Sequence, residues 1–355
     1  MKRLLAAALV FVLTLSFTGC AESPASAGAS GDDDTLIVFN YGEYMDPEVI
    51  EQFTKETGIK IKYEEAVTAE EMYTKYKAGA IKYDLLCTCD YMFKRLIEEG
   101  ELKEVDFSSF EYGKNIGKKY WDFAKAFDPD NKYALPYFWG TIGILYDKTR
   151  VKEPVDSWDV LFNGEYAGDI IMQNSVRDTF AITEKYLGYS LNTTDKEEIQ
   201  NTYETLVKQK SDVGAYLVDE ARDEVVAGNA VMAVVYSGEA YLGHEYNENL
   251  EYVVPKEGSN VWLDAWGITK NCENIEAAQK FLDYLCREDV ALKDFEYIYY
   301  MTPNDTVKGQ LPEELQNNKT LFPDDEATKN CEVSTLTDPE TNNLLNELWK
   351  ELKSN

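Results

Sequence analysis

Aromatic and acidic side chains occur together in several short segments of the sequence. Tyr41 to Tyr44 contains two tyrosines and Glu43, Tyr236 to Glu239 contains a ring and an acid, and Val261 to Trp266 contains two tryptophans and Asp264. A ring face attracts a cation by about 0.5 to 2 kcal/mol, and a charge-assisted hydrogen bond to a carboxylate adds roughly 1.5 to 3 kcal/mol. Rings and carboxylates together therefore indicate a small organic cation as the class of ligand. The alternative is that these rings belong to the core, as most rings of any chain do.

Strands and helices alternate around these segments. The first part of the chain predicts strands at Leu36 to Phe39, Ile59 to Glu64 and Tyr83 to Cys89, with helices at Asp46 to Thr57 and Ala69 to Ala78 between them. The helix signals are an acid and a proline at the start and a glycine at the end. This rhythm is typical of an open α/β sheet.

The second part of the chain resumes the alternation. Strands are predicted at Gly143 to Tyr146, Ile170 to Gln173 and Ala230 to Tyr236, and helices at Thr179 to Leu187, Glu197 to Lys210, Asn274 to Arg287 and Thr341 to Leu352. In open α/β sheets ligands bind at the loops that follow the carboxyl ends of the strands. That rule selects four loops: Tyr41 to Tyr44, Cys89 to Tyr91, Asn174 to Asp178 and Tyr236 to Glu239.

Size and charge limit the class of protein. A chain of 355 residues with 44% hydrophobic content exceeds what one core usually encloses, so two lobes are expected. The formal net charge of −30 excludes nucleic acid as a natural partner. A negative field attracts cations, but it also keeps a surface protein in solution, so it supports a cationic ligand only weakly.

The N-terminus predicts export. Lys2 and Arg3 precede an apolar run from Leu4 to Phe17, which is typical of a secretory signal peptide over residues 1–19 and is shorter than the ~20 residues of a spanning helix. The segment from Ser16 to Cys20 resembles the bacterial lipobox, with Phe17 where leucine is usual, so Cys20 is expected to carry lipid and residues 20–34 to form a tether. The alternative is an ordinary cleavage site with an incidental cysteine.

The remaining cysteines predict free thiols. They are odd in number, which suits a disulfide framework poorly, and Cys87 and Cys89 are two residues apart, which fits neither a CxxC redox motif nor a zinc site. The other three are Cys272, Cys286 and Cys331. No metal and no cofactor are expected.

Several motifs in register resemble the periplasmic spermidine/putrescine-binding proteins. The likeness covers nearly all of residues 35 to 354 and is carried by Phe39 to Tyr44, Gln52 to Lys60, Tyr133 to Gly140, Trp262 to Asp264, Thr302 to Asn304 and Asn318 to Asp324. It implies a two-lobed periplasmic-binding-protein fold of type II, each lobe an open sheet flanked by helices. We expect lobe 1 to comprise residues 35–139 and 263–308, and lobe 2 residues 140–262 and 309–355, with a hinge between them.

The resemblance also implies a set of ligand-binding residues in the cleft between the lobes. They are Tyr41, Glu43, Tyr44, Cys89, Tyr91, Ser175, Asp178, Tyr236, Trp262, Asp264, Tyr300 and Ser334. Tyrosine stands for the family's tryptophan at positions 41 and 236, cysteine for serine at 89, serine for aspartate at 175, and serine for glutamine at 334. The acids at 43, 178 and 264 retain the polyamine class but leave open the choice among putrescine, spermidine and agmatine. Glu239, in a neighbouring loop, is a candidate to replace the carboxylate missing at Ser175.

The implied function is capture of a polyamine for an ABC importer. Such a protein closes its hinge around the ligand and docks on membrane permease subunits served by a separate ATPase; this chain has no GxxxxGK[ST] motif of its own. We expect a monomer, lipid-anchored at the outer face of the cell membrane or in the periplasm. Thiamine, iron(III) or a sugar are alternative ligands. A secreted glycoside hydrolase is the enzymatic alternative, although no GxSxG or HExxH motif occurs and the only histidine, His244, is expected to be exposed in a loop.

Overall fold

One mixed sheet runs through the part of the chain that the computed structural model describes, residues 35–218, 220–335 and 338–354. Within these residues nine strands pair in the order β2-β1-β3-β9-β4-β7-β5-β6, and β8 pairs with β4. The strands are β1 (Thr35–Tyr41), β2 (Lys60–Ala66), β3 (Leu85–Cys89), β4 (Leu135–Asp147), β5 (Ile170–Gln173), β6 (Val213–Leu217), β7 (Met232–Tyr236), β8 (Leu250–Val253) and β9 (Val261–Ile268). The expected α/β architecture is therefore present.

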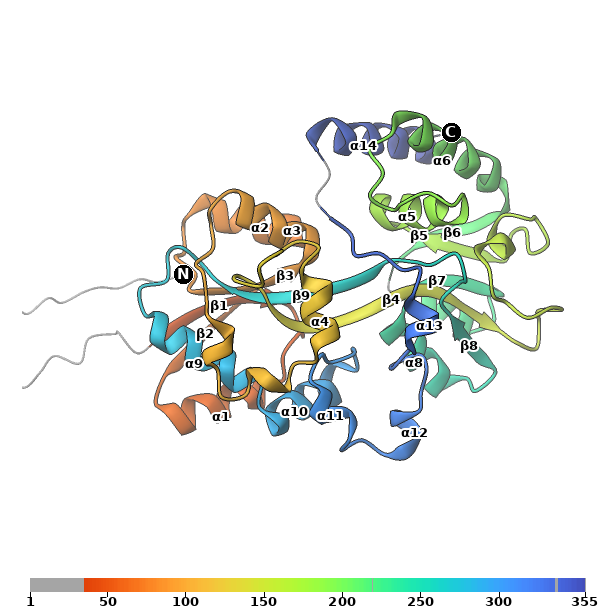
Figure 1. The fold of residues 1–355 in the computed structure, drawn as a ribbon. Helices are drawn as coiled ribbons and strands as arrows, with labels where there is room; N and C mark the ends of the chain where they lie inside the picture. Colours follow the sequence, from red (N-terminus) through yellow and green to blue (C-terminus); the bar gives the residue numbers. More distant parts are fainter. Residues whose placement is uncertain (1–34, 219, 336–337, 355) are drawn as a thin grey trace, which may run out of the picture. The chain divides into compact units, whose positions relative to one another are not determined.

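Helices cover the lobe 1 strands. They are α1 (Pro47–Thr57), α2 (Ala69–Ala78), α3 (Asp90–Glu98), α4 (Lys118–Ala124), α9 (Ile275–Leu285), α10 (Glu288–Ile298) and α11 (Asp305–Lys308). Figure 1 shows α2 on one side of the parallel strands β1, β2 and β3, and α1 with α9 on the other. The start of α1 follows from its sequence, because Asp46 accepts a hydrogen bond from the Glu48 N–H and Pro47 occupies the first turn.

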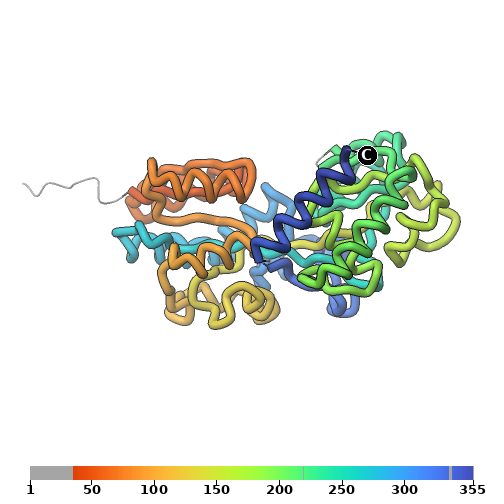
Figure 2. The backbone as a smooth tube through the Cα atoms, turned by 90° about the horizontal axis from the view of Figure 1, so that it is seen from above, coloured from red at the N-terminus to blue at the C-terminus, as the bar shows by residue number. Residues whose placement is uncertain are grey.

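The lobe 2 strands carry a second set of helices, α5 (Val176–Tyr186), α6 (Lys196–Gln209), α7 (Glu220–Val226), α8 (Ser237–Tyr246) and α14 (Pro339–Ser354); two short helices, α12 (Glu313–Gln316) and α13 (Asp325–Thr328), precede α14. The C-terminal helix α14 lies beside α6, as Figure 2 shows in dark blue against green. Leu348 and Leu352 of α14 pack with Phe180 and Leu206 in one buried apolar cluster. That burial fixes the C-terminal helix on lobe 2.

Two long strands join the halves of the sheet. β4 pairs with β9 between Leu135 and Thr141 and then with β7 from Ile142 onward. Its apolar residues change cluster at the same point. Gly140 of β4 is paired with Trp262 of β9. A Cβ at Gly140 would lie 2.4 Å from the Trp262 ring, so the packing of this ring against β4 requires glycine there. The predicted lobe boundaries, and the hinge crossings expected near Trp139, Trp262 and Lys308, stay predictions.

Three local expectations were wrong. The strand predicted at Gly143 to Tyr146 is only part of the longer β4, because pairing with β9 extends the strand back to Leu135. His244 lies in α8 rather than in a loop, although it is exposed as expected. The strands β3 and β7 pass directly into α3 and α8, so the two loops expected after them are the first turns of helices.

Some expectations concern residues 1–34, which lie outside the described residues: the signal peptide, lipidation at Cys20 and the tether. In the ranges that are described, no helix combines the length and apolarity needed to cross a membrane. Cys87, Cys89, Cys272, Cys286 and Cys331 are free thiols.

Candidate functional site

A cavity of about 1170 Å³ opens where strand ends of both lobes meet. Its walls come from the carboxyl ends of β1, β3 and β7, from β9, and from the first turns of α3, α5 and α8. All of the residues predicted to bind ligand line it: Tyr41, Glu43, Tyr44, Cys89, Tyr91, Ser175, Asp178, Tyr236, Trp262, Asp264, Tyr300 and Ser334. The strand-end rule therefore located the cavity.

The lobe 1 wall holds a buried aspartate paired with a tyrosine. Asp264 stands on β9 opposite Cys89 of β3, and the Tyr44 hydroxyl donates to Asp264 Oδ2 at 2.7 Å. Burial raises the pKa of Asp264 to about 6, although the Tyr44 hydrogen bond opposes the rise. The neighbouring ring of Tyr41 is held by its hydroxyl, 3.2 Å from Thr88 Oγ1. A cation bound in the cavity beside Asp264 would stabilise the charged form of its carboxyl.

The lobe 2 wall repeats the arrangement. The Tyr236 hydroxyl donates to Asp178 Oδ2 at 2.9 Å, and burial raises the pKa of Asp178 despite that bond. Ser175 is the N-cap of α5, where its Oγ accepts from the Asp178 N–H at 3.3 Å. Ser175 thus holds the backbone of the aspartate in place, so its hydroxyl is already engaged.

Four aromatic rings connect the two aspartates. The ring centroids of Tyr44 and Tyr300 are 6.1 Å apart, those of Tyr300 and Trp262 5.2 Å, and those of Trp262 and Tyr236 6.3 Å. Gly238 makes room for this row, because a Cβ there would lie 2.3 Å from the Tyr300 ring. The rings pack edge to face, with interplanar angles of 64°, 83° and 88°, so the cavity is lined by a row of aromatic side chains with a carboxyl near each end, which suits an elongated cation.

An arginine spans the cleft beside this row of rings. The Arg177 guanidinium lies over the Tyr91 ring, 4.2 Å from its centroid. Its Nη2 donates to Ser334 Oγ at 3.0 Å and to the Thr335 carbonyl at 2.7 Å. On lobe 1 the Tyr91 hydroxyl donates to Glu70 Oε1 at 2.8 Å. Arg177 thus links α5 and the C-terminal segment of lobe 2 to α3 of lobe 1.

Sequence reasoning missed part of the lining. Asn260 lines the cavity, as do Glu65 near the end of β2 and Glu70 and Glu71 in the first turn of α2; Asp90 and Arg177, which lie inside two of the selected loops but were not among the predicted ligand-binding residues, line it too. The strand-end rule could have found these three glutamates, since they lie at or shortly after the carboxyl end of β2. Glu239 also lines the cavity, but Arg222 Nη1 donates to its Oε2 at 2.7 Å. Its charge is therefore already compensated, which weakens it as a substitute for the missing carboxylate.

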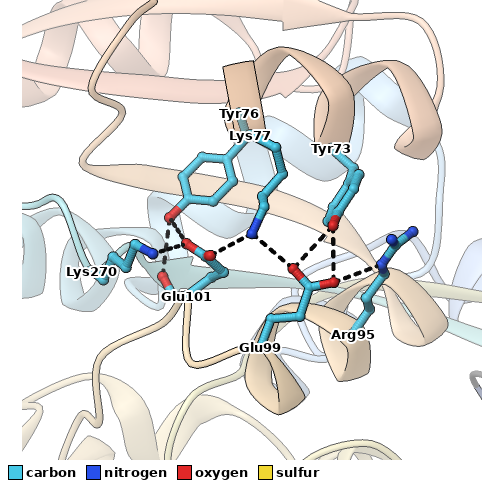
Figure 3. A network of polar contacts seen from close by, with 7 residues as sticks. All are labelled: Tyr73, Tyr76, Lys77, Arg95, Glu99, Glu101 and Lys270. Atoms are coloured by element: carbon cyan, nitrogen blue, oxygen red, sulfur yellow. Dashed lines mark hydrogen bonds and ion pairs between the residues drawn. The ribbon is translucent and has the colours of Figure 1, made fainter. Parts of the chain in front are cut away.

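A second group of acids lies on lobe 1 outside the cavity (Figure 3). Lys77 Nζ bridges Glu99 Oε2 at 3.0 Å and Glu101 Oε1 at 2.6 Å, Arg95 also contacts Glu99, and Lys270 contacts Glu101 at 2.8 Å. Burial works against ionisation of Glu99, yet these hydrogen bonds lower its pKa to about 2. Each carboxylate already has cationic partners, so this network ties α2 to α3 and β9 and offers no free charge to a ligand.

The fold and the cavity together define an extracellular solute-binding protein. The family model for bacterial extracellular solute-binding proteins matches residues 48–323, and the chain belongs to this family, which is one of binding proteins and not of enzymes. The fold is the periplasmic-binding-protein fold of type II. It resembles the maltose-binding protein MalE of Listeria monocytogenes with a TM-score of 0.62 at 16% identity, over 90% of this chain and 91% of that one.

Two other proteins are more similar to this chain than the maltose-binding protein is. The spermidine/putrescine-binding periplasmic protein of Escherichia coli is 37% identical over 312 residues, 86% of this chain and 88% of that protein. The structure of the spermidine/putrescine ABC transporter substrate-binding protein PotD of Streptococcus pneumoniae superposes with a TM-score of 0.83 at 37% identity, covering 90% of this chain and 99% of that one. The family resemblance inferred from the sequence motifs is confirmed.

Proposed function

We propose that the protein captures a polyamine in the interlobe cavity and delivers it to the permease of an ABC importer. The observation that carries the proposal is the row of four rings with a buried, tyrosine-bonded aspartate near each end. A linear polyamine matches this arrangement, because its ammonium groups need carboxylates and ring faces while its methylene segments need apolar walls. The names of the E. coli and S. pneumoniae relatives support the same ligand class.

The charge state of the aspartates explains why a cation is preferred to a neutral sugar. Burial raises the pKa of both Asp264 and Asp178, so the ligand-free protein holds two carboxyls whose charge is poorly solvated. A neutral ligand leaves that cost in place. An ammonium group removes it, and contacts from both lobes then favour closure of the cleft around the ligand. We assign ligand contact to the predicted residues of the lining, with Asp264 and Asp178 as the principal anchors.

The same proposal covers where the protein works. We infer that residues 1–19 direct export, that Cys20 carries the lipid, and that the monomer docks from outside on permease subunits served by a separate ATPase, without catalysing a reaction itself. Labelling of the cells with a radioactive fatty acid tests the anchor: wild-type protein should take up label, and Cys20→Ser should take up none. Equal labelling of both would place the lipid elsewhere or exclude it.

The ligand is tested by thermal unfolding of residues 35–355 with putrescine, spermidine, agmatine, thiamine, iron(III) and maltose in turn. A ligand at about 100 times its dissociation constant adds ~2.7 kcal/mol to the stability of the protein that binds it. A shift with an amine would support the proposal and rank the amines. A shift with iron(III) or maltose alone would show that the cavity binds another class of solute.

A further inference from the structure

One buried carboxyl in the cavity has no role in the site described so far. Asp90 follows the end of β3 and opens helix α3, and it is 2% exposed. The Tyr91 N–H donates to Asp90 Oδ1 at 2.6 Å. Asp90 Oδ2 is buried and has no hydrogen-bond partner in the described ranges of the chain. Asp90 nevertheless lines the cavity.

The structural role of Asp90 accounts for only one of its two oxygens. A side chain that accepts from the Tyr91 N–H in the first turn of α3 needs a single acceptor, and asparagine or serine would supply it without burying an ionisable group. A buried polar atom without a partner costs free energy and calls for an explanation. The explanation must therefore concern Oδ2 and what reaches it when the cavity is filled.

The charged groups around Asp90 come from three elements. Asp264 faces it from β9 and Cys89 from β3, while Arg177 faces it from α5. The Arg177 Nη2 is directed at Ser334 and Thr335 rather than at Asp90. Burial raises the pKa of Asp90 to about 8, and Asp264 adds to the rise, while the backbone N–H groups of Tyr91 and Leu263 and the charge of Arg177 oppose it. In the ligand-free protein at neutral pH this carboxyl is therefore mostly neutral.

We propose that Asp90 is a third ligand carboxylate and that it receives one ammonium group of a triamine, so that the cavity distinguishes triamines from diamines. The inference rests on the proposed function and deepens it. Three buried aspartates, Asp90, Asp178 and Asp264, then match three ammonium groups. Asp90 thus adds a carboxyl to a lining in which serine stands at position 175 and Arg222 holds Glu239.

The proposal includes a proton transfer. The ligand ammonium already carries its positive charge, so the proton leaves the Asp90 carboxyl for solvent as the Asp90 carboxylate pairs with the ammonium. Binding of a triamine at pH 7 should therefore release more protons than binding of a diamine, which leaves one of the three carboxyls without a partner.

The test is calorimetry of wild type, Asp90→Asn and Asp294→Asn with spermidine and with putrescine. Asp294 is a matched control, because it is also 2% exposed but lies outside this cavity with both oxygens bonded, to the Asp46 N–H and the Tyr137 hydroxyl. We expect Asp90→Asn to weaken spermidine binding at least tenfold and putrescine binding less than threefold. Asp294→Asn should leave the ratio of the two affinities unchanged.

Several results would overturn the assignment. An unchanged spermidine affinity in Asp90→Asn, an equal loss for both amines, or a wild type that binds putrescine only would each remove Asp90 as a triamine contact while leaving polyamine capture intact. A wild type that binds neither amine would remove the proposed function itself.

A second measurement does not depend on the variant folding. Calorimetry of the wild type in buffers of different ionisation enthalpy at pH 7 counts the protons released. More protons released with spermidine than with putrescine supports the proposal, and equal numbers contradict it.

Discussion

The carboxyls of the cavity and those of the lobe 1 network in Figure 3 differ in what neutralises them. Glu99 and Glu101 lie between Lys77, Arg95 and Lys270. Asp264 and Asp178, in contrast, are each bonded by a tyrosine hydroxyl and by no cation in the described chain. The pKa of Glu99 falls to about 2, whereas that of Asp264 rises to about 6.

This difference separates structural acids from binding acids. A carboxylate whose cationic partners are part of the fold stabilises that fold and has little left for a ligand. A buried carboxyl without such a partner costs stability until a cation arrives from outside. Net charge alone does not distinguish the two, since both groups contribute equally to the −30 of the chain.

The largest expected effect is the loss of ligand at Asp264. Asp264→Asn removes the charge but keeps an oxygen for the Tyr44 hydroxyl, so polyamine affinity should fall about 100-fold, or ~3 kcal/mol. The free energy of unfolding without ligand should stay the same or rise, because a poorly solvated carboxyl is gone. Calorimetry and urea unfolding measure the two quantities. Unchanged affinity would remove Asp264 from the site.

The opposite result is expected in the network. Glu101→Gln removes the charge that Lys77 and Lys270 share, so the free energy of unfolding should fall by ~2 kcal/mol while polyamine affinity stays within twofold. Urea unfolding and calorimetry of this variant and of Asp264→Asn should give opposite results: one variant loses stability and the other loses affinity. If Glu101→Gln weakened binding as strongly as Asp264→Asn does, the division between structural and binding acids would be wrong.

The pH dependence should also have opposite signs in the two regions. The pKa of Asp264 is raised from about 4 in the unfolded chain to about 6, so the folded protein favours the neutral acid and loses this stabilisation as pH rises through that interval. The pKa of Glu99 is lowered to about 2, so its contribution is lost as pH falls from about 4 to about 2.

Urea unfolding between pH 2 and pH 7 measures both slopes without ligand. Asp264→Asn should flatten the change between pH 4 and pH 6, and Glu99→Gln should flatten the acid limb. Because the ligand needs the ionised Asp264, putrescine affinity should be at least about tenfold lower at pH 5 than at pH 7, and spermidine affinity should fall further, since Asp90 must also ionise to receive a triamine. An affinity that is the same at both values would mean that Asp264 is ionised before the ligand binds.

The sequence predicted the position of the site better than its chemistry. Helices α1 and α2 have the predicted ends because Asp46, Gly58 and Gly79 give local signals that do not depend on the rest of the chain. The strand-end rule likewise needs only the alternation of elements. The alternation of elements therefore accounts for the position of the cavity, whereas Trp262, Asp264, Tyr300 and Ser334 of its lining followed from the family resemblance.

Pairing of charges could not be predicted in the same way. Glu239 and Asp178 look alike in sequence, each close to a ring or a strand end, but Arg222 of a separate helix forms an ion pair with Glu239 and not with Asp178. The free oxygen of Asp90 depends on the packing of β3, β9 and α5 around it. Which acids await a ligand is thus decided by tertiary contacts between segments far apart in the chain.

The smallest predicted effect concerns Arg177, which departs from the comparison because it brings a positive charge to the cavity wall. Its guanidinium lies on lobe 2 and its ring partner Tyr91 on lobe 1, so Arg177→Gln should weaken the closed form by ~0.5 to 1 kcal/mol and speed polyamine release about threefold. Arg177→Lys keeps the charge but loses the planar stacking and should lie between wild type and Arg177→Gln. Stopped-flow dissociation measures this. Slower release from Arg177→Gln would instead mean that the guanidinium competes with the ligand for the Tyr91 ring.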